Sequence, residues 1–306
     1  MKIESIVQSR RAFLQSAFAA CALLGIERLD AVHAAQSQVS FQGEDVFNRI
    51  VEKAKANNWR ALPIGELMGK IAKEFEGTPY KGGTLEIATD HEVCSVNLGA
   101  LDCVTFFEST LDFARMLKLG GSKPADLLAQ VRYTRYRGGK PGDYSTRLHY
   151  TTDWYADNVQ KHVIKLLAPE MPGAQPFTQP VGFMTANPDK YKQLAADPKL
   201  VEKMKHHEAE INARSLKYIP LDKLAAVEPL LKTGDLVGVC TKFSGLDIAH
   251  TGLVYRTEDG VAHFMDASSK KANMKVTIEP GPISKALSWS SDLTGAMFAR
   301  PLEPKA

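Results

Sequence analysis

A predicted β-hairpin near the C-terminus constrains the fold most. Residues 251–255 are apolar and rich in β-branched side chains, and residues 261–265 repeat this pattern after the Glu258-Asp259-Gly260 turn. Two such runs joined by a short turn that contains glycine predict an antiparallel pair of strands. A further strand is expected at residues 236–239, directly after the Gly234-Asp235 turn. The C-terminal part of the chain is therefore predicted to form an antiparallel sheet.

Helical patterns come before these strands. Apolar side chains recur every three or four residues over 44–76, which predicts helices there. Another helix is expected over residues 103–119, with Asp102 as its N-cap. Residues 189–214 have the charge content of an exposed helix. Helices followed by an antiparallel sheet indicate an α+β fold.

The residue pattern at the N-terminus predicts that the protein is exported. The Arg10-Arg11 pair is followed by the apolar residues 17–26 and by Val32-His33-Ala34, which suits cleavage by a signal peptidase. This layout is typical of a Tat-type signal peptide over residues 1–35. The apolar run is too short to anchor the chain in a bilayer. We therefore expect the mature protein to be periplasmic.

Beyond this leader, residues 36–306 are expected to form a single domain with an insertion around residues 120–215. The formal net charge of the whole chain is +3 and there is no long basic run, so nothing favours nucleic acid as a partner. No segment is apolar enough to predict a transmembrane helix. The four cysteines form no Cys-x-x-Cys pair, and no metal or other cofactor is predicted. His206 and Glu210, one helical turn apart, lack the third ligand that a zinc amidase needs.

Cys103 is a candidate nucleophile because of its place at the start of a predicted helix. The helix dipole and the unpaired backbone N–H groups of the first turn favour the thiolate form of such a cysteine. The same N–H groups can bind the oxyanion of a tetrahedral intermediate. Considered alone, Cys103 could also be a buried structural residue, since free cysteines are often buried.

His250 and Asp266 are candidate partners for this thiol. His250 starts the first strand of the predicted hairpin, and Asp266 ends the second. A carboxylate at Asp266 can accept the ring N–H of His250 and fix its tautomer. His263 lies an odd number of residues from Asp266, so the two point to opposite faces of a strand and only one can be the partner. Considered alone, each of these residues could be purely structural.

Six short blocks that include these residues occur in a fixed order. They are Gly77-Thr78-Pro79-Tyr80, Gly82-Gly83, Asp102-Cys103, Gly234-Asp235, His250-Thr251-Gly252 and Asp266-Ala267-Ser268. This set resembles the pattern of the NlpC/P60 cysteine peptidases and amidases. The resemblance departs from the wider superfamily at the third site position, which is often His there and is Asp266 here.

Further blocks resemble one branch of that superfamily, DUF1460. They are Gly83-Thr84-Leu85-Glu86, Leu101 to Glu108, Arg135-Tyr136-Arg137, Tyr144 to Tyr150, Asp153-Trp154 and Gly245-Leu246-Asp247. The resemblance covers nearly all of the chain after the leader. It implies a papain-like core, in which the helix that starts at Cys103 packs on the antiparallel sheet, with added helical elements. It also implies a cysteine amidase that cuts between N-acetylmuramic acid and L-alanine in peptidoglycan fragments (muropeptides).

The resemblance implies a catalytic role for Cys103, His250 and Asp266. The backbone N–H of Cys103 and the hydroxyl of Tyr80 are expected to stabilise the oxyanion. Two further carboxylates in matching blocks are expected near the substrate, and they are Asp102 and Asp247.

The Tyr- and Arg-rich residues 125–165 form a candidate substrate wall. Arginine pairs with carboxylates, which muropeptides carry, and aromatic rings stack on sugars. The residues expected to contact the substrate are Arg147, Tyr150, Asp153 and Trp154.

Two other functions remain open at the level of sequence. An NlpC/P60 endopeptidase that cuts γ-D-glutamyl–diamino acid bonds would use the same three catalytic residues. A non-catalytic protein that binds the cell wall would keep the fold without the reaction. The sequence also leaves open the oligomeric state, the preference for polymeric wall or released fragment, and whether Cys94 and Cys240 form a disulfide.

Overall fold

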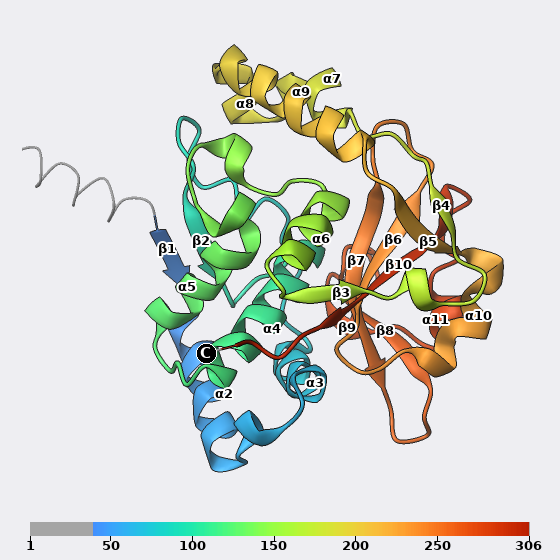
Figure 1. The fold of residues 1–306 in the computed structure, drawn as a ribbon. Helices are drawn as coiled ribbons and strands as arrows, with labels where there is room; N and C mark the ends of the chain where they lie inside the picture. The colour runs from blue at the N-terminus through green and yellow to red at the C-terminus, as the bar shows by residue number, and fades with distance from the viewer. Residues whose placement is uncertain (1–38, 306) are drawn as a thin grey trace, which may run out of the picture. The chain divides into compact units, whose positions relative to one another are not determined.

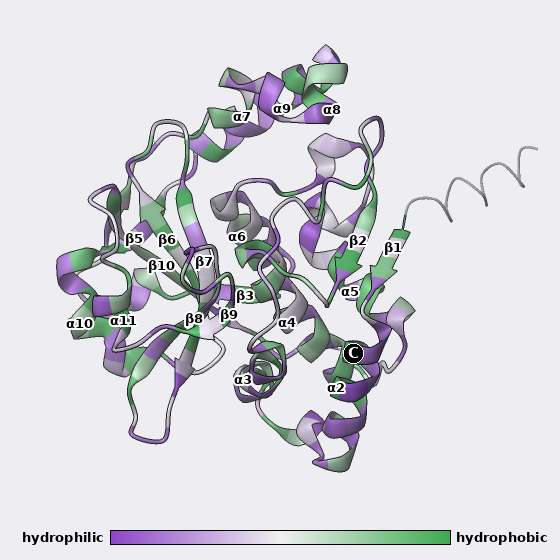
Figure 2. Cartoon of the chain, turned by 180° about the vertical axis from the view of Figure 1, so that it is seen from behind, coloured by the Kyte–Doolittle hydropathy of each residue, from purple (hydrophilic) through white to green (hydrophobic). Residues whose placement is uncertain are grey.

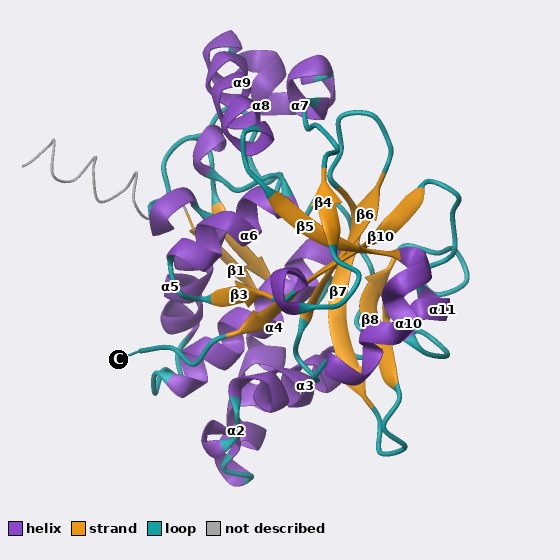
Figure 3. Cartoon of the chain, turned by 45° about the vertical axis from the view of Figure 1, so that its right-hand side comes forward, coloured by secondary structure: helices purple, strands orange, loops and turns teal. Residues whose placement is uncertain are grey.

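The computed structural model describes residues 39–305, so the predicted signal peptide at residues 1–35 lies outside the described residues. Nearly all of the described part belongs to one compact unit, which begins at Phe41. Within it, helices gather on one side of an antiparallel sheet (Figures 1 and 3). The predicted α+β class is confirmed. Over residues 39–305, no helix combines the length and the apolarity needed to cross a bilayer.

The helical side carries most of the longer helices. They are α2 (Glu44–Ala56), α3 (Ile64–Phe75), α4 (Cys103–Lys118), α5 (Pro124–Arg135) and α6 (Thr151–Gln160). The predicted helical region 44–76 is confirmed as α2 and α3, which a short 3-10 turn at Trp59–Ala61 separates. Two short strands, β1 (Val39–Gln42) and β2 (Cys94–Asn97), complete the N-terminal half.

The sheet contains the predicted hairpin as strands β7 and β8. Its strands, in spatial order, are β4 (Gln175–Phe177), β5 (Leu216–Pro220), β10 (Leu293–Pro301), β6 (Leu236–Thr241), β7 (Ile248–Arg256), β8 (Ala262–Ser268) and β9 (Lys275–Ile278), and β3 (Ile164–Leu166) pairs with β10. All of these pairings are antiparallel. The prediction of an antiparallel C-terminal sheet is therefore confirmed.

The two faces of the sheet are covered differently. Helix α4 contacts β7 and β8 on one face. On the other face, the short helices α10 (Leu224–Val227) and α11 (Ile283–Ala286) bury an apolar cluster with the central strands. Figure 2 shows hydrophobic stretches concentrated in the strands and the inner helices. Because both faces are covered, the central strands are buried along most of their length, as strand β6 illustrates.

A separate group of helices has its own small core. It comprises α7 (Phe183–Ala186), α8 (Lys192–Ala196) and α9 (Pro198–Asn212), which lie together at one end of the unit (Figure 1). The charged helix predicted over 189–214 is confirmed in α9, although one face of α9 is buried against Tyr144, Tyr150 and Met184.

A buried ion pair ties α4 to the two helices beside it. Glu108, which is 1% exposed, accepts hydrogen bonds from Arg135 Nε and Trp154 Nε1, both at 2.9 Å. Arg135 is 2% exposed and also donates to the carbonyl of Ser95. A buried charge of this kind is tolerated only because its partner lies beside it.

Replacing Glu108 with glutamine should destabilise the protein strongly. The variant leaves Arg135 buried without a counter-charge, which costs about 3–5 kcal/mol in comparable cases. Urea denaturation followed by circular dichroism measures this as a fall in the midpoint at constant slope. The matched control is Glu76→Gln, which removes an exposed ion pair with Lys73 and should cost less than about 1 kcal/mol. Equal midpoints for the two variants would contradict the assigned role of Glu108.

Candidate active site

A capping box fixes the first turn of α4 and with it the position of Cys103. The Asp102 carboxylate accepts a hydrogen bond from the Thr105 backbone N–H at 2.7 Å, and Thr105 Oγ1 accepts one from the Asp102 N–H at 2.8 Å. This reciprocal pair stabilises the helix start. Cys103 is the first helical residue and is partly exposed, so its thiol lies beside backbone N–H groups that have no partner within the helix. One oxygen of the Asp102 carboxylate, Oδ1, is used by the cap.

His250 lies between Cys103 and Asp266. Its Nε2 is 2.6 Å from Asp266 Oδ2, and its ring is within side-chain hydrogen-bonding reach of the Cys103 thiol. Since Nε2 is taken by Asp266, Nδ1 is the ring nitrogen left for the thiol. The three residues come from α4, β7 and β8, and the contacts of α4 with these two strands bring them together.

The surroundings of His250 favour its charged form. Burial lowers the pKa of the imidazole, but negative charge at Cys103 and hydrogen bonds with Asp266 and Cys103 outweigh burial and raise the pKa to about 10. Burial raises the pKa of Asp266, and the hydrogen bond with His250 offsets part of this rise. The arrangement is therefore suited to a thiolate–imidazolium pair held in place by a carboxylate.

His263 lies on the opposite face of β8 from Asp266, as strand alternation requires. Its Nδ1 is 3.3 Å from the carbonyl of Glu279, and its Nε2 is 3.1 Å from Thr257 Oγ1. Of the two candidate partners left open by the sequence, Asp266 is the one beside His250.

Tyr80 pairs with Leu101, two residues before Cys103. The turn that carries Tyr80 is fixed by hydrogen bonds from its N–H to the carbonyl of Met274 and from the Leu101 N–H to the carbonyl of Pro79. Burial, and then negative charge at Cys103 and Asp102, raise the pKa of the Tyr80 hydroxyl. The phenol is therefore protonated at neutral pH and can donate a hydrogen bond near Cys103.

Asp247 has a positioning role in the structure. It is 3% exposed and accepts hydrogen bonds from the backbone N–H and the hydroxyl of Thr152, both at 2.7 Å. These bonds tie the residue before β7 to the first turn of α6. Asp247 therefore fixes the start of the strand that carries His250, and it has no free carboxylate to offer a ligand.

The predicted substrate wall is wrong for the four residues chosen from the Tyr- and Arg-rich segment. They are all buried, with exposures of 4% for Arg147, 3% for Tyr150, 2% for Asp153 and 2% for Trp154. Arg147 forms ion pairs with Glu86 and Glu92. The buried guanidinium of Arg147 is neutralised by these two carboxylates and does not face a substrate.

The other three have internal partners as well. The Tyr150 hydroxyl donates to Glu208 at 2.7 Å, and the Trp154 indole donates to Glu108. Asp153 accepts hydrogen bonds from Arg137 and Arg214, each at 2.7 Å. These partners are distant in sequence, so the residue types alone could not reveal that the charges are neutralised inside the protein.

Trp289 and Lys270 lie beside the site although the sequence did not single them out. They line a cavity of about 100 Å³ together with His250 and Asp266. The Trp289 ring meets the His250 ring edge-on, with centroids 5.9 Å apart. The only signal in the sequence was an isolated tryptophan in the polar stretch before β10.

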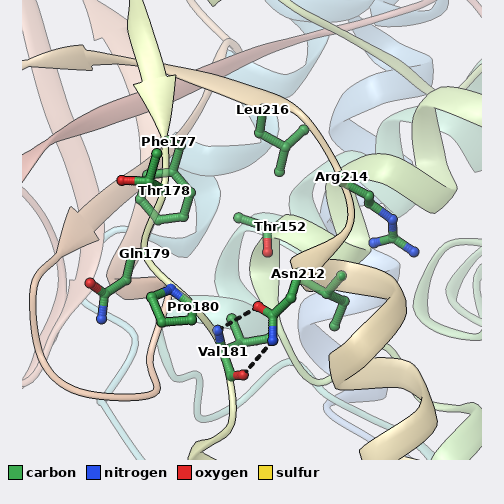
Figure 4. Close-up of a pocket in the computed structure, with 10 residues that line it drawn as sticks. Thr152, Phe177, Thr178, Gln179, Pro180, Val181, Asn212, Arg214 and Leu216 are labelled. Atoms are coloured by element: carbon green, nitrogen blue, oxygen red, sulfur yellow. Dashed lines mark hydrogen bonds between the residues drawn. The ribbon is translucent and has the colours of Figure 1, made fainter.

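Figure 4 shows a different cavity of about 80 Å³, between the strand-like segment 175–181 and the end of α9. Its wall is held by two hydrogen bonds between Asn212 and the backbone of Val181, at 2.8 and 2.9 Å. Cys103, His250 and Asp266 do not line it. This cavity is therefore separate from the candidate site.

The remaining cysteines and the histidine pair of α9 take no part in the site. Cys94 and Cys240 are buried free thiols, which answers the question of their pairing. His206 is 3.3 Å from Glu210, and over residues 39–305 no three His, Cys, Asp or Glu side chains are grouped as a metal would need.

Comparison with known proteins finds a family model and a solved structure that both carry the name N-acetylmuramoyl-L-alanine amidase. The family described as AmiA-like, N-acetylmuramoyl-L-alanine amidase-like, matches residues 70–282. A crystal structure of an N-acetylmuramoyl-L-alanine amidase from Bacteroides uniformis is 30% identical, covers 78% of this chain and 99% of its own, and superposes with a TM-score of 0.72. No curated protein matches the chain.

Two further structures share the fold. A protein of Bacteroides fragilis, provisionally named a xylanase, is 32% identical, covers 75% of this chain and 98% of its own, and has a TM-score of 0.67. A DUF1460 protein of Legionella pneumophila is 20% identical, covers 85% of this chain and 95% of its own, and has a TM-score of 0.61. Since the family match spans more than half of the sequence, this chain belongs to the AmiA-like family of N-acetylmuramoyl-L-alanine amidase-like proteins.

Proposed function

We propose that this protein is a periplasmic cysteine amidase that hydrolyses the amide between N-acetylmuramic acid and L-alanine in muropeptides. The observation that carries the proposal is the position of His250, which lies between the thiol at the start of α4 and the buried carboxylate of Asp266. This arrangement supports a papain-like core of the NlpC/P60 type. The periplasmic location rests on the twin-arginine leader.

The proposed reaction uses the thiol, the imidazole and the carboxylate in turn. The Cys103 thiolate attacks the lactyl carbonyl carbon, and the backbone N–H groups of the first turn of α4 together with the Tyr80 hydroxyl stabilise the oxyanion. The protonated His250 gives its proton to the leaving amine of L-alanine, and the C–N bond breaks. His250 then takes a proton from water, which attacks the thioester and releases the free acid and the thiolate. Asp266 orients the His250 ring throughout.

The scissile bond is supported by the family and by the name of the Bacteroides uniformis structure. An endopeptidase that cuts γ-D-glutamyl–diamino acid bonds would use the same thiol and imidazole. Digestion of a defined muropeptide followed by mass spectrometry separates the two, because an amidase releases a free lactyl acid and an endopeptidase releases a free diamino acid. A non-catalytic wall-binding protein would release neither.

Replacing Cys103 with alanine should abolish hydrolysis of N-acetylmuramoyl-L-alanyl-D-glutamate. The variant loses the nucleophile, while the capping box that starts α4 stays intact, so the melting temperature should change little. Product masses and differential scanning calorimetry measure the two effects. Cys94→Ala is the matched control, because Cys94 is a buried thiol outside the site, and it should remain active. Near-normal turnover in Cys103→Ala would rule out the proposed nucleophile.

Replacing Asp266 with asparagine should lower kcat by about 10²–10⁴-fold, as loss of the orienting carboxylate does in comparable sites. It should also shift the alkaline side of the pH profile. His250, with a pKa raised to about 10, keeps its proton up to that pH, and activity falls as pH rises through this value. Without the Asp266 charge the histidine pKa drops, so the fall should begin at lower pH.

The pH dependence of kcat/KM measures this shift, with Glu258→Gln, an exposed change in the hairpin turn, as the control. An alkaline limb in Asp266→Asn that coincides with that of the unmodified protein would refute the role of Asp266.

A further inference from the structure

The cavity beside His250 has features that the proposed reaction does not use. It opens next to the His250–Asp266 pair and is walled by Trp289 and Lys270. Trp289 lies in the loop between α11 and β10, and Lys270 lies two residues after the end of β8. A tryptophan, a lysine and a buried carboxylate therefore meet at one side of the candidate site.

Trp289 is held in place yet remains open to solvent. Its ring stacks on Phe264, with centroids 6.4 Å apart and an interplanar angle of 17°, and meets His250 edge-on. Even so, Trp289 is 41% exposed. An indole fixed by two ring contacts, with apolar surface left uncovered, offers a rigid platform for a ligand.

Lys270 supplies a positive charge over the Trp289 ring. Its Nζ lies 5.4 Å from the centre of the Trp289 ring and 2.9 Å from Glu279 Oε2. The Lys270 side chain is 42% exposed. An ammonium group has three donors, so Lys270 can bind a second carboxylate while it keeps its contact with Glu279.

Asp266 adds an acceptor within the cavity. Its Oδ2 is engaged by His250, but its Oδ1 is buried and has no hydrogen-bond partner among the described residues. A buried carboxylate oxygen without a partner is costly, so a donor from a ligand N–H would be favoured there.

The direction of the proposed reaction decides which part of the substrate reaches this cavity. His250 protonates the leaving amine, so the peptide that begins with that amine lies next to the His250 ring. The cavity beside that ring is also lined by Trp289 and Lys270. The peptide that carries the leaving amine would therefore lie against these two side chains.

We propose that this cavity is the subsite for the peptide part of the substrate, with Trp289 under the peptide chain and Lys270 paired with a peptide carboxylate. The inference rests on the proposed function, because that function places the leaving amine at His250. It assigns a binding role to Lys270, with specificity for short peptides that carry a free carboxylate.

Calorimetric titration of the full chain carrying Cys103→Ala tests the subsite without turnover. The probes are L-alanyl-D-glutamate and the same dipeptide with both carboxylates converted to amides. The acid should bind about fivefold more tightly than the diamide, as expected for a partly exposed ion pair. Adding Lys270→Gln should remove this preference, since glutamine can still hydrogen-bond to Glu279 but carries no charge. The matched control, Lys271→Gln, removes an exposed charge next to it and should keep the preference.

Three results would overturn the subsite. They are absence of dipeptide binding, equal binding of acid and diamide, and equal weakening of both probes by Lys270→Gln, which would indicate a structural role through Glu279. Hydrolysis of N-acetylmuramoyl-L-alanyl-D-glutamate by the unmodified protein is measured in parallel. If the charge-dependent binding occurs without hydrolysis, the proposed function fails and the subsite stands. If hydrolysis occurs without charge-dependent binding, the subsite fails and the proposed function stands.

Discussion

The packing of the first turn of α4 against strands β7 and β8 is the constraint on which the site depends. The Asp102–Thr105 capping box sets the residue at which the helix begins, and the sheet sets where His250 and Asp266 lie. Gly252 allows the two strands to come this close, because a side chain at that position would overlap the carbonyl oxygen of Met265. A shift of one residue in either element would separate the thiol from the imidazole.

Buried charges inside the helical layer hold α4 and its neighbouring helices in place. Glu108, Arg135, Arg147 and Asp153 are buried and paired with one another or with neighbouring polar groups. Such pairs add little net stability but penalise alternative packings, since any other arrangement leaves a charge unpaired. The same residues therefore hold the helices in register instead of contacting a ligand.

Local patterns in the sequence were sufficient for much of the fold. The hairpin and the helix that begins at Cys103 depend on residues near one another in sequence. Strand alternation showed that only one of Asp266 and His263 could be the partner of His250, but it did not say which. Burial could not be predicted in the same way. In the sequence Arg147 resembles a ligand-binding arginine, but in the structure it forms ion pairs with Glu86 and Glu92. Trp289 could not be assigned to the site from the sequence, because only the fold brings its ring to His250.

The most direct measurement is the mass of the acyl group trapped on Cys103 when the protein is mixed with a muropeptide and quenched in acid before turnover. Intact-protein mass spectrometry, followed by digestion to locate the adduct, should find an N-acetylmuramoyl group bound as a thioester to Cys103. An acyl group that also contains L-alanine and D-glutamate would show that the γ-D-glutamyl bond is cut instead. An adduct on another residue, or hydrolysis without any adduct, would contradict the role of Cys103 as nucleophile.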